Sequence, residues 1–157
     1  DSPVALRIFA NALATIVNGE VTQMFSSRHQ ANRNDYYQRI YAKTASLFET
    51  STDTVGLLGQ IDEATRSSLK TFGYELGMAF QIVDDLLDIK GDAASLGKSV
   101  GKDRAQNKLT YPAVLGVEES RRRAEALINE AQEELHVFGA QARCLQSLAC
   151  YVLERNR

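Results

Sequence analysis

The sequence predicts an all-α protein, an antiparallel helical bundle formed by a single domain over residues 1–157. Three observations indicate this. Apolar residues recur with helical spacing along most of the chain. The chain has only 2 prolines and 10 glycines, and it has few of the β-branched runs that are typical of strands. A length of 157 residues suits one compact domain.

Five long helices and one short helix are predicted. Ser2 and Pro3 are typical of a helix N-cap and first helical position, and Asn34 or Asp35 can cap the second helix. The predicted helices are 3–25, 35–48, 62–89, 110–115, 118–136 and 143–154. The predicted connections are a polar stretch at 26–34, a loop or broken helix at 51–59, and a loop at 92–108 after Gly91.

Each predicted helix carries an apolar face. The first has Leu6, Phe9, Leu13, Ile16 and Val17. The second has Tyr37, Ile40, Tyr41, Thr44, Ala45 and Phe48. The third has Phe72, Leu76, Phe80, Val83 and Leu87, and the helix that Gly139 ends has Ala124, Leu127, Ile128, Ala131 and Leu135.

Composition and charge exclude several classes of protein. Eighteen Lys and Arg residues against 20 Asp and Glu residues give a net charge of −2, without the basic field that nucleic acid attracts. No run approaches the roughly 18 consecutive apolar residues of a membrane span. The start DSPVALR does not resemble a signal peptide. We therefore expect a cytoplasmic protein whose two cysteines, Cys144 and Cys150, are reduced and lie in the core.

The segment GMAFQIVDDLLDIKGD places a narrow acidic stripe on an otherwise apolar helix, which predicts carboxylates that line an interior cleft. Such carboxylates repel one another and lose hydration, so they would take up protons or gather cations. Oxygen ligands suit Mg²⁺, which binds through one or two carboxylates and substrate phosphates. Alternatively, the stripe faces solvent or is neutralised by basic side chains of neighbouring elements. The stripe consists of Gly77, Gln81, Asp84 and Asp88, with Asp85 at its edge.

A cationic loop follows the acidic helix. An anion with several oxygens, such as diphosphate, would bridge its lysines and a metal ion, although a solvated surface turn is the alternative. Lys43 and Thr44 would add donors at the rim of the same cleft. The basic residues of the loop are Lys98, Lys102, Arg104 and Lys108.

These motifs resemble those of the trans-isoprenyl diphosphate synthases, the polyprenyl synthetase family. The runs FQIVDDLLDIKGD, LGKSVGKD and NKLTYPAVLG follow in the family's order over residues 80–116, and KTASLFE and the ending LACYVLERNR also match. The resemblance implies the isoprenoid synthase fold and a head-to-tail prenyl transfer. In that reaction an allylic diphosphate ionises with the help of Mg²⁺ and lysines, and isopentenyl diphosphate attacks the cation.

The resemblance also implies roles for individual residues. The implied metal ligands are Asp84, as the main ligand, with Asp85 and Asp88 acting through water or outer contacts. The implied catalytic and diphosphate-binding residues are Lys43, Thr44, Gln81 and Lys98. Phe80 would lie by the homoallylic substrate, and Lys108, near Asp103, would belong to a closing loop. In some members C-terminal residues cover the active site, a role for Arg155 and Arg157 that is the less favoured alternative here.

The sequence departs from the family by lacking its first aspartate-rich motif and its N-terminal GxK motif. We therefore expect a C-terminal part of a longer synthase, inactive alone, whose product length cannot be read from the sequence. The alternatives are a non-catalytic subunit of a heteromeric synthase and a class I terpene cyclase. Family members dimerise through helices in the region of residues 4–25, so a homodimer is also expected. The alternative is that a partial chain exposes core surface there and associates for that reason.

Overall fold

The computed structural model describes residues 2–25, 33–95 and 110–155, and for residues 23–25 and 90–95 it describes the backbone alone. Within these ranges every regular element is a helix. The α-helices are α1 (Pro3–Phe25), α2 (Arg33–Ile40), α3 (Ser46–Leu58), α4 (Glu63–Ser95), α5 (Tyr111–Leu115), α6 (Val117–Glu134) and α7 (Arg143–Glu154). A π-helical segment, η1 (Tyr41–Ala45), joins α2 to α3, and a 3-10 segment, η2 (His136–Ala142), joins α6 to α7.

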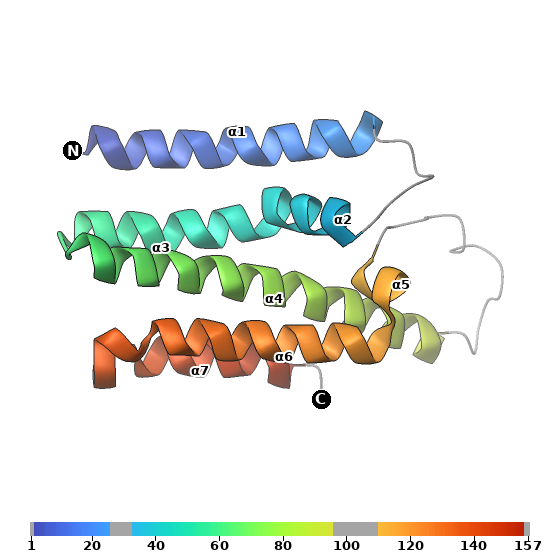
Figure 1. The fold of residues 1–157 in the computed structure, drawn as a ribbon. Coiled ribbons are helices and arrows are strands. Elements are labelled where there is room, and N and C mark those ends of the chain that lie inside the picture. Colours follow the sequence, from blue (N-terminus) through green and yellow to red (C-terminus); the bar gives the residue numbers. More distant parts are fainter. Residues whose placement is uncertain (1, 26–32, 96–109, 156–157) are drawn as a thin grey trace.

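The long helices lie side by side with alternating directions, and α4 lies in the middle of the bundle (Figure 1). It packs against α3 on one side and against α6 on the other. Phe72, Leu76 and Val83 of α4 are buried together with the predicted inner face of α6. The predicted all-α antiparallel bundle and these two apolar faces are confirmed.

Glycines on α4 allow α3 and η1 to approach its backbone closely. A Cβ atom at Gly77 would stand 2.6 Å from the Cα atom of Ala45. A Cβ atom at Gly73 would stand 2.7 Å from the carbonyl oxygen of Phe48. Because real Cβ atoms do not make such contacts, this packing requires glycine. The close approach brings Thr44, next to Ala45, onto the face of α4 that carries the acidic stripe.

The position of a capping side chain predicts the start of α4 correctly, whereas a glycine does not mark its end. The predicted start at Asp62 is confirmed, since its Oδ1 accepts from the Thr65 amide at 3.0 Å. The expected stop at Gly91 is wrong, because α4 continues to Ser95. A glycine inside a helix costs only about 1 kcal/mol, which a helix of 33 residues tolerates.

Residues 51–59, expected as a loop or broken helix, are helical as far as Leu58. The hydroxyl of Ser51 donates to a backbone carbonyl one turn earlier at 2.7 Å, so this polar residue is satisfied within the helix. Buried Asp53 accepts from Arg66 of α4 at 2.7 Å, which ties α3 to its neighbour. Tertiary contacts therefore stabilise a segment whose composition alone favours a loop.

Helix α1 packs on α3 and η1 along one side. Of its described side chains, only Ala12 is buried. Several of its predicted apolar residues are largely exposed, for example Leu6 at 71% and Val17 at 60%. Residues Pro3–Thr22 are also long and apolar enough to cross a membrane, although no run of consecutive apolar residues suggested it. This is weak evidence for a span, because helices of soluble proteins and signal sequences meet the same criterion.

The expectation that both cysteines lie in the core is wrong. Cys144 and Cys150 are free, as expected, but both are exposed on α7. That helix turns Ala149 and Val152 toward the core instead. The two cysteines lie outside this buried face of the helix.

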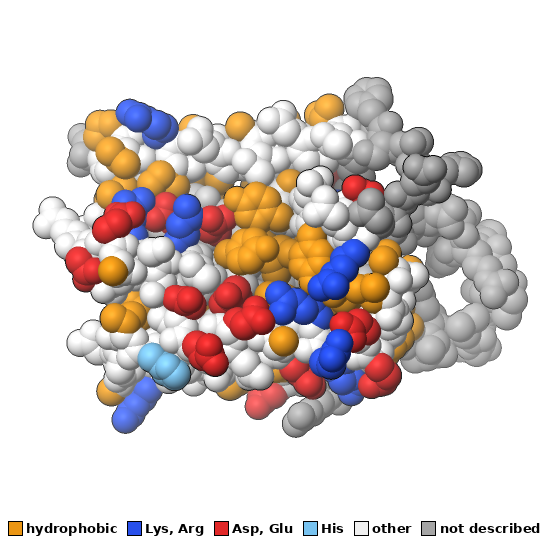
Figure 2. Space-filling model, in the orientation of Figure 1, with side chains coloured by type: hydrophobic (Ala, Val, Ile, Leu, Met, Phe, Trp, Pro, Cys, Tyr) orange, Lys and Arg blue, Asp and Glu red, His pale blue; other side chains and the backbone are white. Residues whose placement is uncertain are grey.

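Glu75 of α4 is a carboxylate enclosed among other acids at the contact with α6. Its Oε2 atom is buried and has no hydrogen-bond partner in the described part of the chain. Burial, and then the charges of Glu130 and Glu134, raise the pKa of Glu75 to about 7. Figure 2 shows acidic side chains gathered near the middle of one face, beside a group of hydrophobic ones. Because its surroundings raise the pKa of Glu75, ionisation of this carboxyl destabilises the folded state.

Replacement of Glu75 by glutamine is expected to stabilise the protein at pH 8 and to have little effect at pH 4. A pKa of about 7 in the folded state lies above the ordinary value of 4.5. Wild type therefore has its full stability below about pH 4.5, where Glu75 is protonated in both the folded and the unfolded state. It loses stability as the pH rises through about 7, because the buried carboxyl must then ionise. The shift corresponds to at most about 3 kcal/mol, which partial exposure reduces to about 1 kcal/mol.

Thermal unfolding of wild type and Glu75→Gln at both pH values measures this effect. Glu125→Gln, at an exposed position in the middle of α6, controls for the loss of one charge. A variant that melts no higher than wild type at pH 8 would contradict the prediction.

Candidate functional site

The three aspartates of the acidic motif lie in three different environments on α4. Asp85 is buried, with 7% of its surface exposed. Asp84 is partly buried, whereas Asp88 is exposed. Among the described residues, no group of three carboxylate, imidazole or thiol side chains is arranged to hold a metal ion. The helix therefore presents two of its three carboxylates at the surface.

Asp85 connects α4 to α2 and α5. Its Oδ2 atom accepts from the hydroxyl of Tyr36 at 2.6 Å and from the backbone amide of Tyr111 at 3.0 Å. Its Oδ1 atom accepts from the side-chain amide of Gln81 at 3.2 Å. Burial, and next the negative charge of Asp85, raise the pKa of Tyr36, which therefore keeps its proton and donates it. Sequence reasoning did not identify Tyr36.

Gln81 joins the acidic motif to the π-helical segment. Its Oε1 atom accepts from the hydroxyl of Thr44 at 2.9 Å, so two residues that the sequence predicted for one site are brought together. The wider turn of η1 changes the helical spacing of the buried residues, which step from Tyr36 to Ile40 and then by five to Ala45. That step of five is the sequence signal for a π segment. Such segments are frequent at functional sites.

Arg155, just beyond α7, covers Asp84 and Phe80. One guanidinium nitrogen lies 2.7 Å from Asp84 Oδ1 and donates to the carbonyl oxygen of Phe80 at 3.0 Å. The guanidinium carbon stands 3.9 Å from the centre of the Phe80 ring. Burial raises the pKa of Asp84, and the Arg155 charge opposes that rise. For Asp84, the alternative prediction that basic side chains of neighbouring elements neutralise the acidic stripe is therefore confirmed.

Phe80 also packs against Phe48 of α3, with ring centres 5.5 Å apart. This contact places an aromatic wall beside the acidic motif, between α3 and the end of α7. Phe80 is thereby in contact with groups from both halves of the described chain.

Lys43 lies next to Thr44 in η1 but is turned toward α1, where its ammonium group lies 3.0 Å from Glu20. Both side chains of this ion pair are about half exposed, so the pair adds little stability. The structure therefore does not bring Lys43 into contact with the acidic motif. The predicted residues Lys98 and Lys108, with Asp103 and Arg157, lie outside the described residues.

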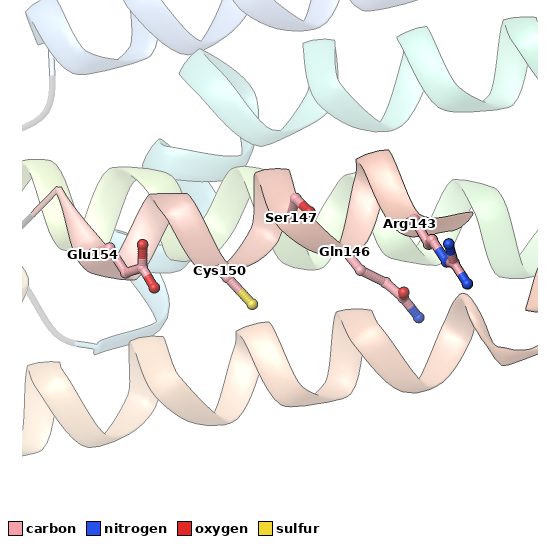
Figure 3. Close-up of a pocket in the computed structure, with 5 residues that line it drawn as sticks. All are labelled: Arg143, Gln146, Ser147, Cys150 and Glu154. Carbon is pink, nitrogen blue, oxygen red and sulfur yellow. The ribbon is translucent and has the colours of Figure 1, made fainter. Parts of the chain in front are cut away.

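A hollow on α7 contains none of the residues predicted for the site. Its lining residues, shown along one side of the helix in Figure 3, are Arg143, Gln146, Ser147, Cys150 and Glu154. Gln132 of α6 donates to the sulfur of Cys150 at 3.1 Å at its edge. Nothing in this lining points to a particular ligand, so we assign the hollow no function.

The donor set of the acidic motif fits a hard divalent cation. Asp84 and Asp88 are four residues apart on one helix, so their side chains are neighbours. Carboxylate oxygens are the ligands that Mg²⁺ prefers, and this ion keeps several waters when it binds to protein. Two neighbouring carboxylates match the protein's share of such a site, which substrate phosphates and water complete.

The chain matches the family model described as polyprenyl synthetase over residues 1–143. It is similar to the geranylgeranyl diphosphate synthase of Cyanophora paradoxa, with 40% identity over 114 residues that cover 73% of this chain and 38% of that protein. It is also similar to the farnesyl diphosphate synthase of Escherichia coli K12, with 37% identity over 129 residues that cover 78% of this chain and 43% of that protein. The chain thus spans less than half the length of these relatives.

Solved structures give the same picture. A decaprenyl diphosphate synthase from Rhodobacter capsulatus superposes with a TM-score of 0.86 at 30% identity, over 99% of this chain and 61% of that chain. A polyprenyl synthase from Caulobacter crescentus, complexed with calcium and isoprenyl diphosphate, gives a TM-score of 0.84 at 26% identity, over 99% of this chain and 60% of that chain.

Proposed function

Since the chain belongs to the polyprenyl synthetase family, we propose that it forms the part of an isoprenyl diphosphate synthase that binds the allylic diphosphate together with Mg²⁺. The resemblance expected from the motifs of residues 80–116 is confirmed by the match over residues 1–143. The observation that carries the proposed site is the hydrogen bond between Thr44 and Gln81, because it joins two predicted diphosphate-binding residues from different helices beside Asp84.

The proposed reaction is the head-to-tail transfer of an allylic group to isopentenyl diphosphate. Asp84 and Asp88 would hold Mg²⁺, which when bound offsets the negative charge that develops on the leaving diphosphate. Gln81 and Thr44 would orient the diphosphate or its water network. Phe80, packed on Phe48, would exclude water from the carbocation, which water would otherwise trap.

The remaining residue roles are also part of this proposal. Lys43 would contribute a cation once it leaves Glu20, and Lys98 and Lys108 would add cations from the segment outside the described residues. Asp85, counted among the metal residues at the sequence level, would act through outer contacts. Because the family's first aspartate-rich motif is absent from this sequence, we expect no turnover by the chain alone.

Assembly and location also remain predictions. The exposed apolar residues of α1 are compatible with the expected homodimer, since a large apolar surface favours association. A cytoplasmic location, and partners limited to the two diphosphate substrates without nucleic acid, are likewise expected.

Calorimetric titration of the 157-residue chain with inorganic pyrophosphate, with and without Mg²⁺, tests the proposed function. We expect binding that requires Mg²⁺, because the carboxylates repel the anion unless a cation bridges them. A titration with sodium sulfate at equal ionic strength controls for unspecific anion binding. No pyrophosphate binding by a chain shown to be helical by circular dichroism would contradict the proposal.

A further inference from the structure

We propose that Asp85 is a positioning residue, which fixes the orientation of the Gln81 amide and so decides which hydrogen-bonding groups the site offers to a diphosphate. This inference rests on the proposed function and assigns Asp85 a role other than metal binding. It follows from the way in which the two oxygens of the Asp85 carboxylate divide their partners.

The two oxygens of Asp85 serve different purposes. Oδ2 accepts both bonds that connect helices, from the Tyr36 hydroxyl at 2.6 Å and from the Tyr111 amide at 3.0 Å. Oδ1 accepts from Nε2 of Gln81 at 3.2 Å, on the same helix. With 7% of its surface exposed and three donors already bound, Asp85 has little access left for a hydrated cation.

The bond to Oδ1 determines the direction of the next bond. A carboxylate only accepts hydrogen bonds, so Gln81 must turn its NH₂ group toward Asp85 and its Oε1 toward Thr44. Since Oε1 also only accepts, the Thr44 hydroxyl must donate its single proton, over 2.9 Å. The acceptor character of Asp85 is thereby transmitted through Gln81 to Thr44.

This direction limits what the site can offer to a ligand. The proton of Thr44 is already used, so its oxygen can only accept, for example from a water molecule. In the described part of the chain, the second N–H of Gln81 remains as a donor. Because diphosphate oxygens are acceptors, Gln81 supplies the direct hydrogen bond to the diphosphate, and Thr44 acts by fixing the amide.

Because the two oxygens of Asp85 have different partners, one variant can change the bond to Gln81 and keep the bonds that connect the helices. In Asp85→Asn, the amide oxygen can take the place of Oδ2 and keep the bonds from Tyr36 and Tyr111. The new NH₂ group then faces the NH₂ group of Gln81, two donors that cannot bond. Gln81 must turn over, so that it donates to Thr44 and frees the threonine proton.

Tyr36→Phe is the matched control, because it weakens the contact between helices and keeps the orientation of Gln81. It removes one bond to Oδ2 and leaves the bond between Asp85 and Gln81 unchanged. Because the Tyr36 hydroxyl is buried, its loss should lower stability. We expect the melting temperature to fall by about 5 °C in Tyr36→Phe and by clearly less in Asp85→Asn.

The first readout is the side-chain amide signal of Gln81 in the ¹⁵N-resolved NMR spectrum, assigned by its absence in Gln81→Glu. We expect this signal to shift in Asp85→Asn, where its partner changes from a carboxylate to a hydroxyl, and to stay in place in Tyr36→Phe. The Tyr111 backbone amide should remain protected from hydrogen exchange in Asp85→Asn. An unchanged Gln81 signal, or a Tyr111 amide that loses protection, would overturn the positioning role.

The second readout is pyrophosphate affinity in the presence of Mg²⁺. We expect the dissociation constant to rise about tenfold in Asp85→Asn and to stay within about threefold in Tyr36→Phe. Because Asp85 is buried, salt screens its charge only weakly, so a salt series would not isolate an effect of lost charge. The Gln81 amide signal makes this distinction, since loss of charge without reorientation would leave the amide turned toward residue 85.

The two readouts separate this inference from the proposed function. If wild type does not bind pyrophosphate with Mg²⁺, the proposed function and the role of Gln81 toward diphosphate are both overturned. If wild type binds and Asp85→Asn binds equally well, only the positioning role is overturned.

Discussion

Replacement of Asp84 by asparagine is expected to abolish the Mg²⁺-dependent part of pyrophosphate binding. Asparagine has nearly the same size, and its oxygen can still accept from Arg155, so the helical fold should remain. The negative charge that would attract the cation is lost. We expect Mg²⁺-dependent affinity to fall by about 100-fold, which corresponds to about 2.7 kcal/mol. Calorimetric titration measures the loss, and circular dichroism checks the fold.

Replacement of Arg155 by glutamine should act in the opposite direction on the same carboxylate. The guanidinium lies 2.7 Å from Asp84 Oδ1 and competes with a metal ion for that oxygen. Its removal should raise Mg²⁺ affinity about fivefold. This factor corresponds to about 1 kcal/mol, the free energy expected for a partly exposed ion pair. Arg121→Gln, the same change at an exposed position of α6, should leave the affinity within twofold. Wild-type affinity in Asp84→Asn, or weaker Mg²⁺ binding in Arg155→Gln, would speak against this assignment.

Replacement of Gly77 by alanine is expected to lower the free energy of unfolding by about 2 kcal/mol or more. Alanine is the better helix former by about 1 kcal/mol, so helix propensity predicts the opposite sign. The added Cβ would stand 2.6 Å from the Cα atom of Ala45, which is backbone and cannot turn aside. Overpacking of this kind usually costs 1–3 kcal/mol or somewhat more. Urea denaturation of both proteins gives the difference.

Gly56→Ala is the matched control in α3. There the added Cβ would meet Arg66 Cγ at 3.1 Å and Ile61 Cδ1 at 3.2 Å, atoms of flexible side chains that can move away. We expect the free energy of unfolding to stay within about 1 kcal/mol of wild type. Equal effects of the two substitutions would show that backbone proximity at Gly77 is not what requires glycine.

The fold was predictable where the chain has one strong period. The apolar faces of α4 and α6 point toward the core as expected, because their spacing follows the regular helix over many turns. Residues 51–59 were not predictable as helix, since the contact that secures them, between Asp53 and Arg66, joins two helices. The exposure of α1 also lies beyond periodicity, which identifies an apolar face but not its partner.

The candidate site was predictable as a set of residues but not as a network. The sequence placed Thr44, Gln81 and Asp84 in one site, and the structure joins the first two by a hydrogen bond. The sequence did not indicate that Asp85 is buried against Tyr36, because a pattern of carboxylates does not reveal which oxygen accepts from which donor. The ion pair between Asp84 and Arg155 joins residues 71 positions apart, which no local pattern encodes.

The π-helical segment has a consequence for any comparison with related chains. It places one extra residue in the helix that runs from Arg33 to Leu58. Deletion of Ala42 would restore regular α-helical winding and rotate everything upstream by about 100°. Tyr36 would then face away from Asp85. An alignment with a chain that has an uninterrupted helix here must therefore open a one-residue gap between Tyr36 and Ala45. Without that gap, Tyr36 would be matched to a position on the wrong side of the helix.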